Sequence, residues 1–152
     1  MTLPKAISYL RKQRKLGKKI VFTNGCFDLI HAGHVRFLNQ AKSLGGVLVV
    51  GVNSDASVKR LKGKGRPVLP LSDRIALLEG LKPVDLVVSF SEDTPLRLIQ
   101  RIKPDVLIKG GDWVADRMVG AEEVREYGGQ VVSGIFVKGR STTGIIRKIK
   151  GA

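Results

Sequence analysis

The chain is poor in cysteine and in acidic residues, and it contains no long apolar run. Cys26 is the only cysteine among 152 residues, so no disulfide can form within the chain. No apolar run approaches the roughly 20 residues that span a bilayer, so we expect no membrane span. The N-terminus lacks the apolar stretch of about 7–15 residues that marks a secretory signal. These absences predict a cytoplasmic protein.

The shortage of acidic residues leaves a strong positive charge. There are 13 Asp and Glu against 27 Lys and Arg, a net charge of +14, with basic clusters at residues 11–19, 59–66 and 147–150. A field of this sign attracts nucleic acid, anionic lipid or small phosphorylated molecules. Aromatic residues reach only 5%, which leaves few platforms for stacking bases, and no nucleic-acid-binding motif is evident. We therefore expect no specific nucleic-acid partner, and nucleic-acid binding stays a remote alternative function.

Short apolar runs alternate with capped helical segments along the whole chain. The pattern predicts strands at 19–24, 47–53, 84–90, 105–110 and 130–137, and helices at 4–15, 33–44, 54–61, 72–81, 94–102, 121–128 and 141–149, with a loop at 63–70. This order predicts an α/β fold, a three-layer Rossmann-like doubly wound parallel sheet with helices on both faces. Residues 1–152 are expected to form a single domain, in which a basic helix within 1–18 precedes the core.

Both histidines of the chain follow the first predicted strand, in the stretch NGCFDLIHAGHV (24–35). Parallel sheets bind ligands beyond the carboxyl ends of their strands, and a helix start favours an anion. His31 and His34 therefore suit a clamp on phosphate oxygens. An acid–base pair, a zinc site and a pair of capping or core histidines are the alternatives. The zinc site lacks a third ligand, because the chain has no further histidine and no second cysteine.

The small and acidic residues of the same stretch have roles of their own in this interpretation. Gly25 and Gly33 allow a ligand to approach the backbone closely, because neither has a side chain. Asp28 is placed to orient an imidazole or to repel a misplaced phosphate. Lys59 and Lys62 belong to a segment with five cations in the eight residues 59–66, which predicts either a phosphate clamp or a solvated loop.

Two motifs carry a resemblance to a known family. GCFDLIHAGHV resembles the GxFDxxHxGH signature of the cytidylyltransferase-like nucleotidyltransferases, and RSTTGII resembles their second signature. The segments VNSDASVKRLKG, VVSFSEDTP and PDVLIKGGDW are similar to the branch that adenylylates heptose 1-phosphate for lipopolysaccharide core synthesis, and the similarity runs from about Lys19 to Ile149. The resemblance implies transfer of AMP from ATP to a heptose 1-phosphate with release of pyrophosphate. The alternatives on the same fold are CTP with glycerol 3-phosphate and ATP with FMN.

The resemblance also implies roles for individual residues. His31, His34 and Lys62 would be catalytic, while Asp28, Lys59 and Arg74 would meet the substrate phosphate. Nucleotide binding is implied for Gly25, Cys26, Phe27, Gly33, Asp55, Gly111, Asp112, Trp113, Ser141, Thr142 and Thr143. The plain alternatives are a surface ion pair for Arg74, a core position for Trp113, and helix capping for Asp55 and Ser141.

The resemblance implies partners as well. Mg²⁺ is expected with ATP, held by phosphate oxygens and water and not by protein side chains. Many relatives carry a sugar-kinase domain ahead of this one, whereas only 18 residues precede the first predicted strand here. A stand-alone form with a separate sugar kinase is therefore expected. Relatives are often homodimers, and the apolar face of residues 4–15 is the surface that we expect to support one.

Overall fold

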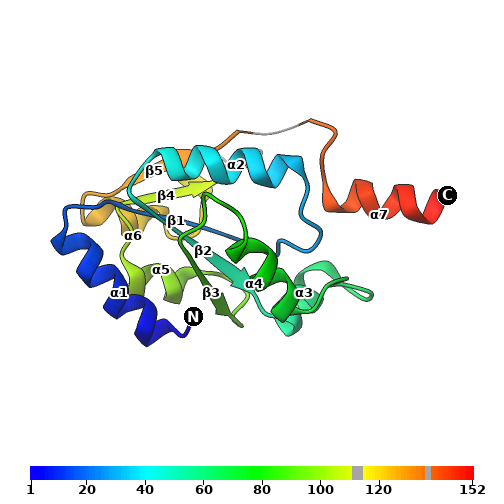
Figure 1. The fold of residues 1–152 in the computed structure, drawn as a ribbon, viewed down its shortest axis with the longest axis horizontal. Helices are drawn as coiled ribbons and strands as arrows, with labels where there is room; N and C mark the ends of the chain where they lie inside the picture. The colour runs from blue at the N-terminus through cyan, green and yellow to red at the C-terminus, as the bar shows by residue number, and fades with distance from the viewer. Residues whose placement is uncertain (111–114, 136–137) are drawn as a thin grey trace.

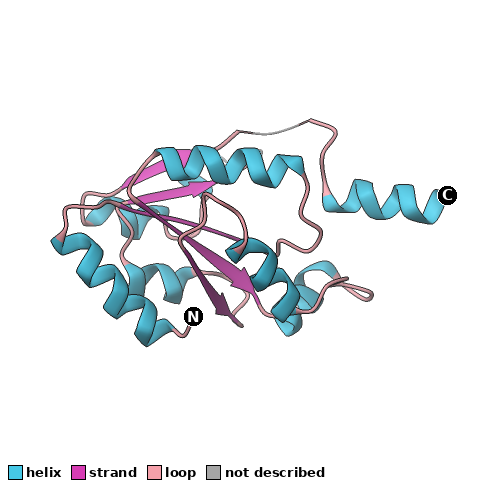
Figure 2. Ribbon diagram, in the orientation of Figure 1, coloured by secondary structure: helices cyan, strands magenta, loops and turns pink. Residues whose placement is uncertain are grey.

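The fold is a parallel sheet with helices on both faces (Figures 1 and 2). A computed structural model describes residues 1–110, 115–135 and 138–152. Five strands pair in parallel in the order β3-β2-β1-β4-β5. They are β1 (Ile20–Gly25), β2 (Val47–Asn53), β3 (Leu86–Phe90), β4 (Val106–Lys109) and β5 (Gln130–Ser133). The predicted α/β class and the parallel sheet are confirmed.

The helices also follow the predicted order. They are α1 (Leu3–Lys15), α2 (Ala32–Ser43), α3 (Asp55–Lys62), α4 (Leu71–Glu79), α5 (Leu96–Ile102), α6 (Ala121–Glu126) and α7 (Thr142–Gly151), with a 3₁₀ turn η1 at Ala115–Arg117. The last strand is shorter than the predicted 130–137: it ends at Ser133, and residues 136–137 lie outside the described part of the chain. No helix in the described ranges has the length and apolar character needed to cross a membrane.

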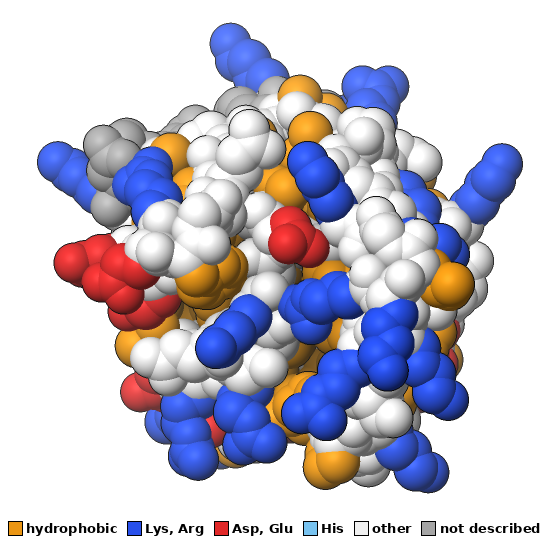
Figure 3. All heavy atoms as spheres, turned by 90° about the vertical axis from the view of Figure 1, so that its left-hand side faces the viewer, with side chains coloured by type: hydrophobic (Ala, Val, Ile, Leu, Met, Phe, Trp, Pro, Cys, Tyr) orange, Lys and Arg blue, Asp and Glu red, His pale blue; other side chains and the backbone are white. Residues whose placement is uncertain are grey.

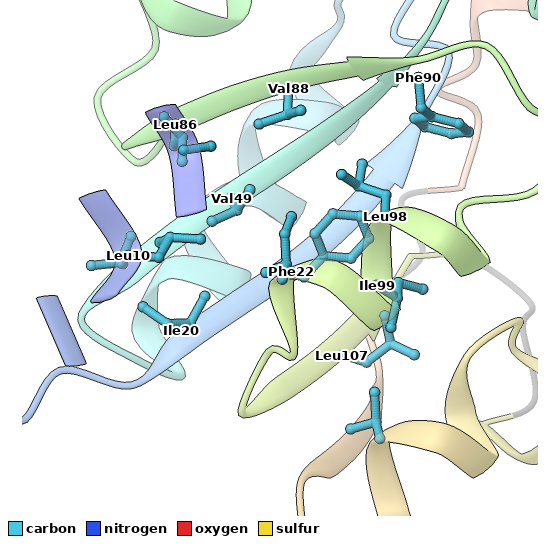
Figure 4. Packing of buried hydrophobic residues seen from close by; sticks show 14 of the residues in the cluster. Leu10, Ile20, Phe22, Val49, Leu86, Val88, Phe90, Leu98, Ile99 and Leu107 are labelled. Carbon is cyan, nitrogen blue, oxygen red and sulfur yellow. The ribbon is translucent and has the colours of Figure 1, made fainter. Parts of the chain in front are cut away.

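Alternate side chains of the strands fill two cores, one on each face of the sheet. In the first core, Ile20 and Phe22 of β1 pack with residues of α1, α5 and α6. Figure 4 shows Leu10 of α1 and Leu98 and Ile99 of α5 in this cluster. In the second core, Val21 packs with residues of α2 and α4. Helix α7 buries no residue and extends away from the sheet (Figure 1).

Helix α1 is part of the first core. Its apolar residues Ala6 and Leu10 are fully buried there. The Met1 amino group donates to the Val87 carbonyl at 3.0 Å. Arg14 donates from Nη2 to the Ile102 and Lys103 carbonyls at 2.6 and 2.7 Å, at the end of α5. The apolar face that we expected to support a dimer is therefore used within the chain, which corrects that prediction.

The strand order places a crevice at the carboxyl end of β1. Strands β2 and β3 follow one another on one side of β1, and the chain then returns to place β4 on the other side of β1. Neighbouring crossovers therefore diverge between β1 and β4, where open α/β sheets bind their ligands.

The burial of α1 predicts a matched pair of stabilities. Leu10→Ala removes a fully buried side chain, and we expect it to lower the free energy of unfolding by about 2–5 kcal/mol. Leu16→Ala alters a residue that is 70% exposed, and we expect a change within about 0.5 kcal/mol. Urea unfolding followed by circular dichroism measures both. Equal effects of the two changes would contradict the placement of α1 in the core.

Candidate functional site

A cavity of about 680 Å³ opens at the carboxyl ends of the strands. Its walls come from the loop after β1, the first turn of α2, the end of α3, the loop after β3, the end of β4 and the start of α7. The loop after β1 runs directly into α2, and the other four segments lie far from these two and from each other in the sequence. The cavity is thus at the crevice that the strand order predicts.

The side chains of the two histidines cap the start of α2 by accepting hydrogen bonds from backbone N–H groups of its first turn. His31 is the N-cap residue, and its Nδ1 accepts from the Gly33 N–H at 3.1 Å. His34 Nδ1 accepts from the His31 N–H at 3.3 Å. The two rings stack with their centroids 3.9 Å apart. Because each Nδ1 is an acceptor, each neutral ring carries its proton on Nε2, which is the donor that it can offer to a ligand.

Both imidazoles line the cavity, and both are held in the neutral form. Burial lowers the pKa of His34 to about 4, with a further contribution from His31. Burial lowers the pKa of His31 too, with a further contribution from Arg140. At neutral pH neither ring is an imidazolium with a proton to give, which disfavours the acid–base pair. The capping role and the phosphate clamp coexist, because capping uses only Nδ1.

The other residues of the first motif pack around this pair. A Cβ at position 33 would lie 2.8 Å from Cε1 of His31, so the stacked ring itself requires Gly33. The Phe27 ring lies 5.3 Å from the His34 ring and occupies the space beside Gly25, where a Cβ would come within 3.0 Å of it. Phe27 adopts φ 47°, a left-handed conformation that is uncommon outside glycine. This sharp turn brings Gly25, Cys26 and Phe27 to the wall of the cavity.

Asp28 is buried, and its carboxylate is bound by protein donors. It accepts from Arg66 Nε at 2.9 Å and from the N–H groups of Val68 and Leu69 at 2.9 Å each. Burial would raise the pKa of Asp28, but the hydrogen bonds from Leu69, Val68 and Arg66 outweigh it and lower the pKa. The carboxylate of Asp28 is therefore bound by loop 63–70 and not by an imidazole. This corrects the predicted orienting role.

Arg74 is fully buried and does not line the cavity. Its Nη1 donates to the Cys26 and Asn53 carbonyls at 2.7 and 2.8 Å. Its Nε donates to the Leu69 carbonyl at 3.1 Å, and its Nη2 donates to Asp55 Oδ1 at 2.7 Å. Four protein acceptors thus occupy the guanidinium. The predicted phosphate contact is therefore wrong, and the predicted ion pair exists, with Asp55, but its arginine is buried and not at the surface.

Both candidate lysines are on helix α3, but only one of them lines the cavity. Its N-cap is Ser54, whose Oγ accepts from the Ser57 N–H at 3.3 Å, while Asp55 pairs with Arg74. Lys62, at the end of the helix, lines the cavity. Lys59 is not among its lining residues. The geometry therefore favours Lys62 over Lys59 as the cation that meets a ligand.

The second motif begins α7 at the mouth of the cavity. Ser141 Oγ accepts from the Gly144 N–H at 2.9 Å and caps the helix. Thr142 Oγ1 donates to the Leu29 carbonyl at 3.0 Å, which ties the motif to the loop before α2. Ser141, Thr142 and Thr143 all line the cavity. The start of α7 thus stands beside the start of α2, whereas Gly111, Asp112 and Trp113 lie outside the described residues.

Several cavity residues were missed by the sequence analysis. Lys109, at the end of β4, and Arg140, just before the second motif, both line the wall. Burial lowers the pKa of Lys109, and the nearby Lys62 lowers it further. Burial raises the pKa of the Cys26 thiol, which is therefore neutral. The signal for Lys109 was present, because a lysine that directly follows the apolar run VLI stands at a strand end.

Charge outside the cavity is also mostly positive. Figure 3, seen from the side away from α7, shows Lys and Arg side chains over much of this face and few acidic ones. Within the described ranges, no three His, Cys, Asp or Glu side chains are grouped closely enough to hold a metal ion.

Comparison with known proteins adds a family. The family Cytidylyltransferase-like matches residues 22–147. The Bifunctional protein HldE of Geobacter metallireducens is 56% identical over 140 residues, which cover 92% of this chain and 29% of that protein. The HldE of Azotobacter vinelandii is 58% identical over 134 residues, 88% of this chain and 28% of that protein. The chain therefore spans less than a third of the length of these relatives.

A solved structure agrees with these matches. The crystal structure of the lipopolysaccharide core biosynthesis protein from Thermoplasma volcanium is similar, with a TM-score of 0.64 and 31% sequence identity. The similarity covers 82% of this chain and 100% of that one.

The neutral His34 predicts a pH-dependent stability. Its pKa of about 4 lies below its ordinary value of 6.5, so the unfolded chain takes up this proton first as the pH falls. The stability contributed by the neutral ring is complete above pH 6.5 and is lost as the pH falls toward 4. From pH 7 to pH 5, wild type should lose more unfolding free energy than His34→Asn, by on the order of 1 kcal/mol. Urea titrations at both pH values measure this, and equal losses would contradict it.

Proposed function

Because the chain belongs to the cytidylyltransferase-like family, we propose that it transfers AMP from ATP to a heptose 1-phosphate and releases pyrophosphate. The product, ADP-heptose, would supply lipopolysaccharide core synthesis. The observation that carries the proposal is the pair of Nε2–H donors beside the starts of α2 and α7. Similarity to HldE proteins and to a lipopolysaccharide core biosynthesis protein supports the choice of sugar.

The proposed chemistry suits neutral histidines. A phosphate oxygen of the sugar 1-phosphate attacks the α-phosphorus of ATP, a new P–O bond forms, and the bond to the β-phosphate breaks as pyrophosphate leaves. The nucleophile is already an anion, so no general base is needed. The protein's task is to position the two anions and to stabilise the charge that develops on the transferred and leaving phosphates.

The roles follow from the placement of the donors. His31 and His34 donate from Nε2 to phosphate oxygens of ATP. The free N–H groups at the starts of α2 and α7 face the same region and favour negative charge there. Lys62 supplies a positive charge from the part of the wall formed by the end of α3.

Magnesium enters this scheme as part of the substrate MgATP. The two carboxylates among the described cavity residues already have partners, since Asp28 pairs with Arg66 and Asp93 pairs with Arg60. The ion is therefore bound mainly by phosphate oxygens and water.

The heptose 1-phosphate requires a source. A sugar kinase that transfers a phosphoryl group from ATP to the anomeric hydroxyl of the heptose supplies it, and the reaction takes place in the cytoplasm, where ATP is made.

The decisive experiment varies both substrates. ATP and CTP are each mixed with Mg²⁺ and with heptose 1-phosphate, glycerol 3-phosphate or FMN, and the products are identified by mass. We expect ADP-heptose from ATP and heptose 1-phosphate. Preference for CTP, or for FMN as acceptor, would assign one of the alternative activities. If no nucleotide binds at low salt with Mg²⁺, the enzyme interpretation fails and nucleic-acid binding is the alternative that remains.

His31→Asn tests the donor role within this assay. Asparagine is a good N-cap residue, so α2 keeps its cap while the Nε2–H donor is lost. We expect kcat to fall about 10²- to 10³-fold, the typical effect of removing one preorganised donor. Asn39→Ala is the control, because this exposed side chain donates to the Val35 carbonyl of its own helix and does not line the cavity. Unchanged turnover in His31→Asn would contradict the role.

The homodimer is proposed on α7 in place of α1. No residue of α7 is buried, and Ile149 is 68% exposed on an apolar stripe of this ten-residue helix. Burial of this stripe against a second copy would remove apolar surface from water. We expect wild type to sediment as a dimer and Ile149→Glu as a monomer. Lys5→Glu in α1 should remain dimeric, and a monomeric wild type would contradict the proposal.

A further inference from the structure

Lys109 stands at the crevice, at the end of a strand that is paired on both sides. It ends β4, which pairs with β1 through Leu107 and with β5 through Lys109 itself, opposite Ser133. The Lys109 carbonyl accepts from the Gly134 N–H at 2.8 Å. The backbone at this position is therefore held on the side of β5, and Lys109 lines the cavity.

Strand alternation puts the Lys109 side chain on the sheet face opposite α2. Leu107 belongs to the core of α1, α5 and α6, whereas Ile108 belongs to the core of α2 and α4. The next residue, Lys109, leaves the strand on the first of these faces. The imidazoles lie at the start of α2, on the second face. The cavity thus has imidazole donors on one side of the sheet edge and a lysine on the other.

Lys62 approaches the same place from α3. Both lysines line the cavity, and the charge of Lys62 lowers the pKa of Lys109, which burial already lowers. Two cations in one partly buried place repel each other, and a phosphate dianion that contacts both would relieve the repulsion. Lysine ammonium groups are common phosphate ligands for this reason.

In-line attack decides which phosphate belongs there. The nucleophile must approach the α-phosphorus from the side opposite the leaving pyrophosphate. The pyrophosphate end of ATP lies with the imidazoles and the two helix starts, in the proposed function. We propose that Lys109 and Lys62 together bind the phosphate group of the acceptor and aim its oxygen at the α-phosphorus. This inference rests on the proposed function and adds a binding residue for the second substrate.

Lys109→Met tests the inference, with Lys109→Arg as the conservative variant. Loss of a charged ligand to phosphate should raise KM for the sugar 1-phosphate about 10- to 100-fold, while the dissociation constant of a non-hydrolysable ATP analogue stays unchanged. Lys109→Arg should keep most of the affinity for the acceptor. Lys82→Met is the control, because Lys82 is exposed and does not line the cavity. Thermal unfolding checks that each variant is folded.

If Lys109→Met binds the ATP analogue more weakly and its KM for the acceptor is unchanged, the inference is overturned and Lys109 belongs to the nucleotide site. A second measurement separates this inference from the proposed function. Calorimetry follows the binding of glucose 1-phosphate and of inorganic phosphate to the protein saturated with the ATP analogue. If wild type turns over no heptose phosphate, the proposed function fails, yet weaker phosphate binding by Lys109→Met than by wild type would still support the phosphate site. Equal binding by the two proteins would overturn it.

Discussion

The capping box at the start of α2 is the interaction on which the site depends. His31 Nδ1 accepts from the Gly33 N–H and His34 Nδ1 accepts from the His31 N–H, so capping uses one edge of each ring and leaves the Nε2 edge for the proposed contact with a ligand. This arrangement determines the tautomer, because a ring that accepts at Nδ1 must carry its proton at Nε2. Protonation of either ring would set two donors against each other and break the cap. Burial and the positive surroundings keep both rings neutral, which is the state that the cap requires.

Two buried charges hold the walls around this pair. Arg74 binds carbonyls of the loop after β1, the end of β2 and loop 63–70, and Asp28 binds donors of the same loop from the other side. Each has nearly all of its hydrogen-bonding capacity used inside the protein, which is how a charged side chain is tolerated in a core. Their effect on a ligand is therefore indirect: they position the backbone of Cys26 and the loop that follows Lys62.

Local patterns in the sequence were sufficient for the fold and for the placement of the two histidines at a helix start. The alternation of apolar runs and capped helices predicted the five strands in order, and the spacing of His31 and His34 predicted a helix start beside a strand end. What failed was the assignment of partners across the chain. Arg74 and Asp28 were expected at a phosphate because charge in a motif looks available until its partner is known. Asp28 pairs with Arg66, which is 38 residues away in the sequence, and no local pattern predicts such a pair. The burial of α1 was missed for the same reason, since an apolar helix face does not say whether the chain or a second copy covers it.

The charges at the cavity divide in a way that the reaction can use. The neutral imidazoles add no net charge to a wall that already contains Lys62, Lys109 and Arg140, so the cavity does not accumulate further repulsion before a ligand arrives. In the proposed function, a bound triphosphate would reverse this balance, because a nearby anion favours the protonated form and raises the pKa of each ring. The cap resists the proton, since Nδ1 is already an acceptor in both rings. In that complex the imidazoles would respond to the anion through stronger Nε2–H hydrogen bonds, and the lysines would supply the positive charge.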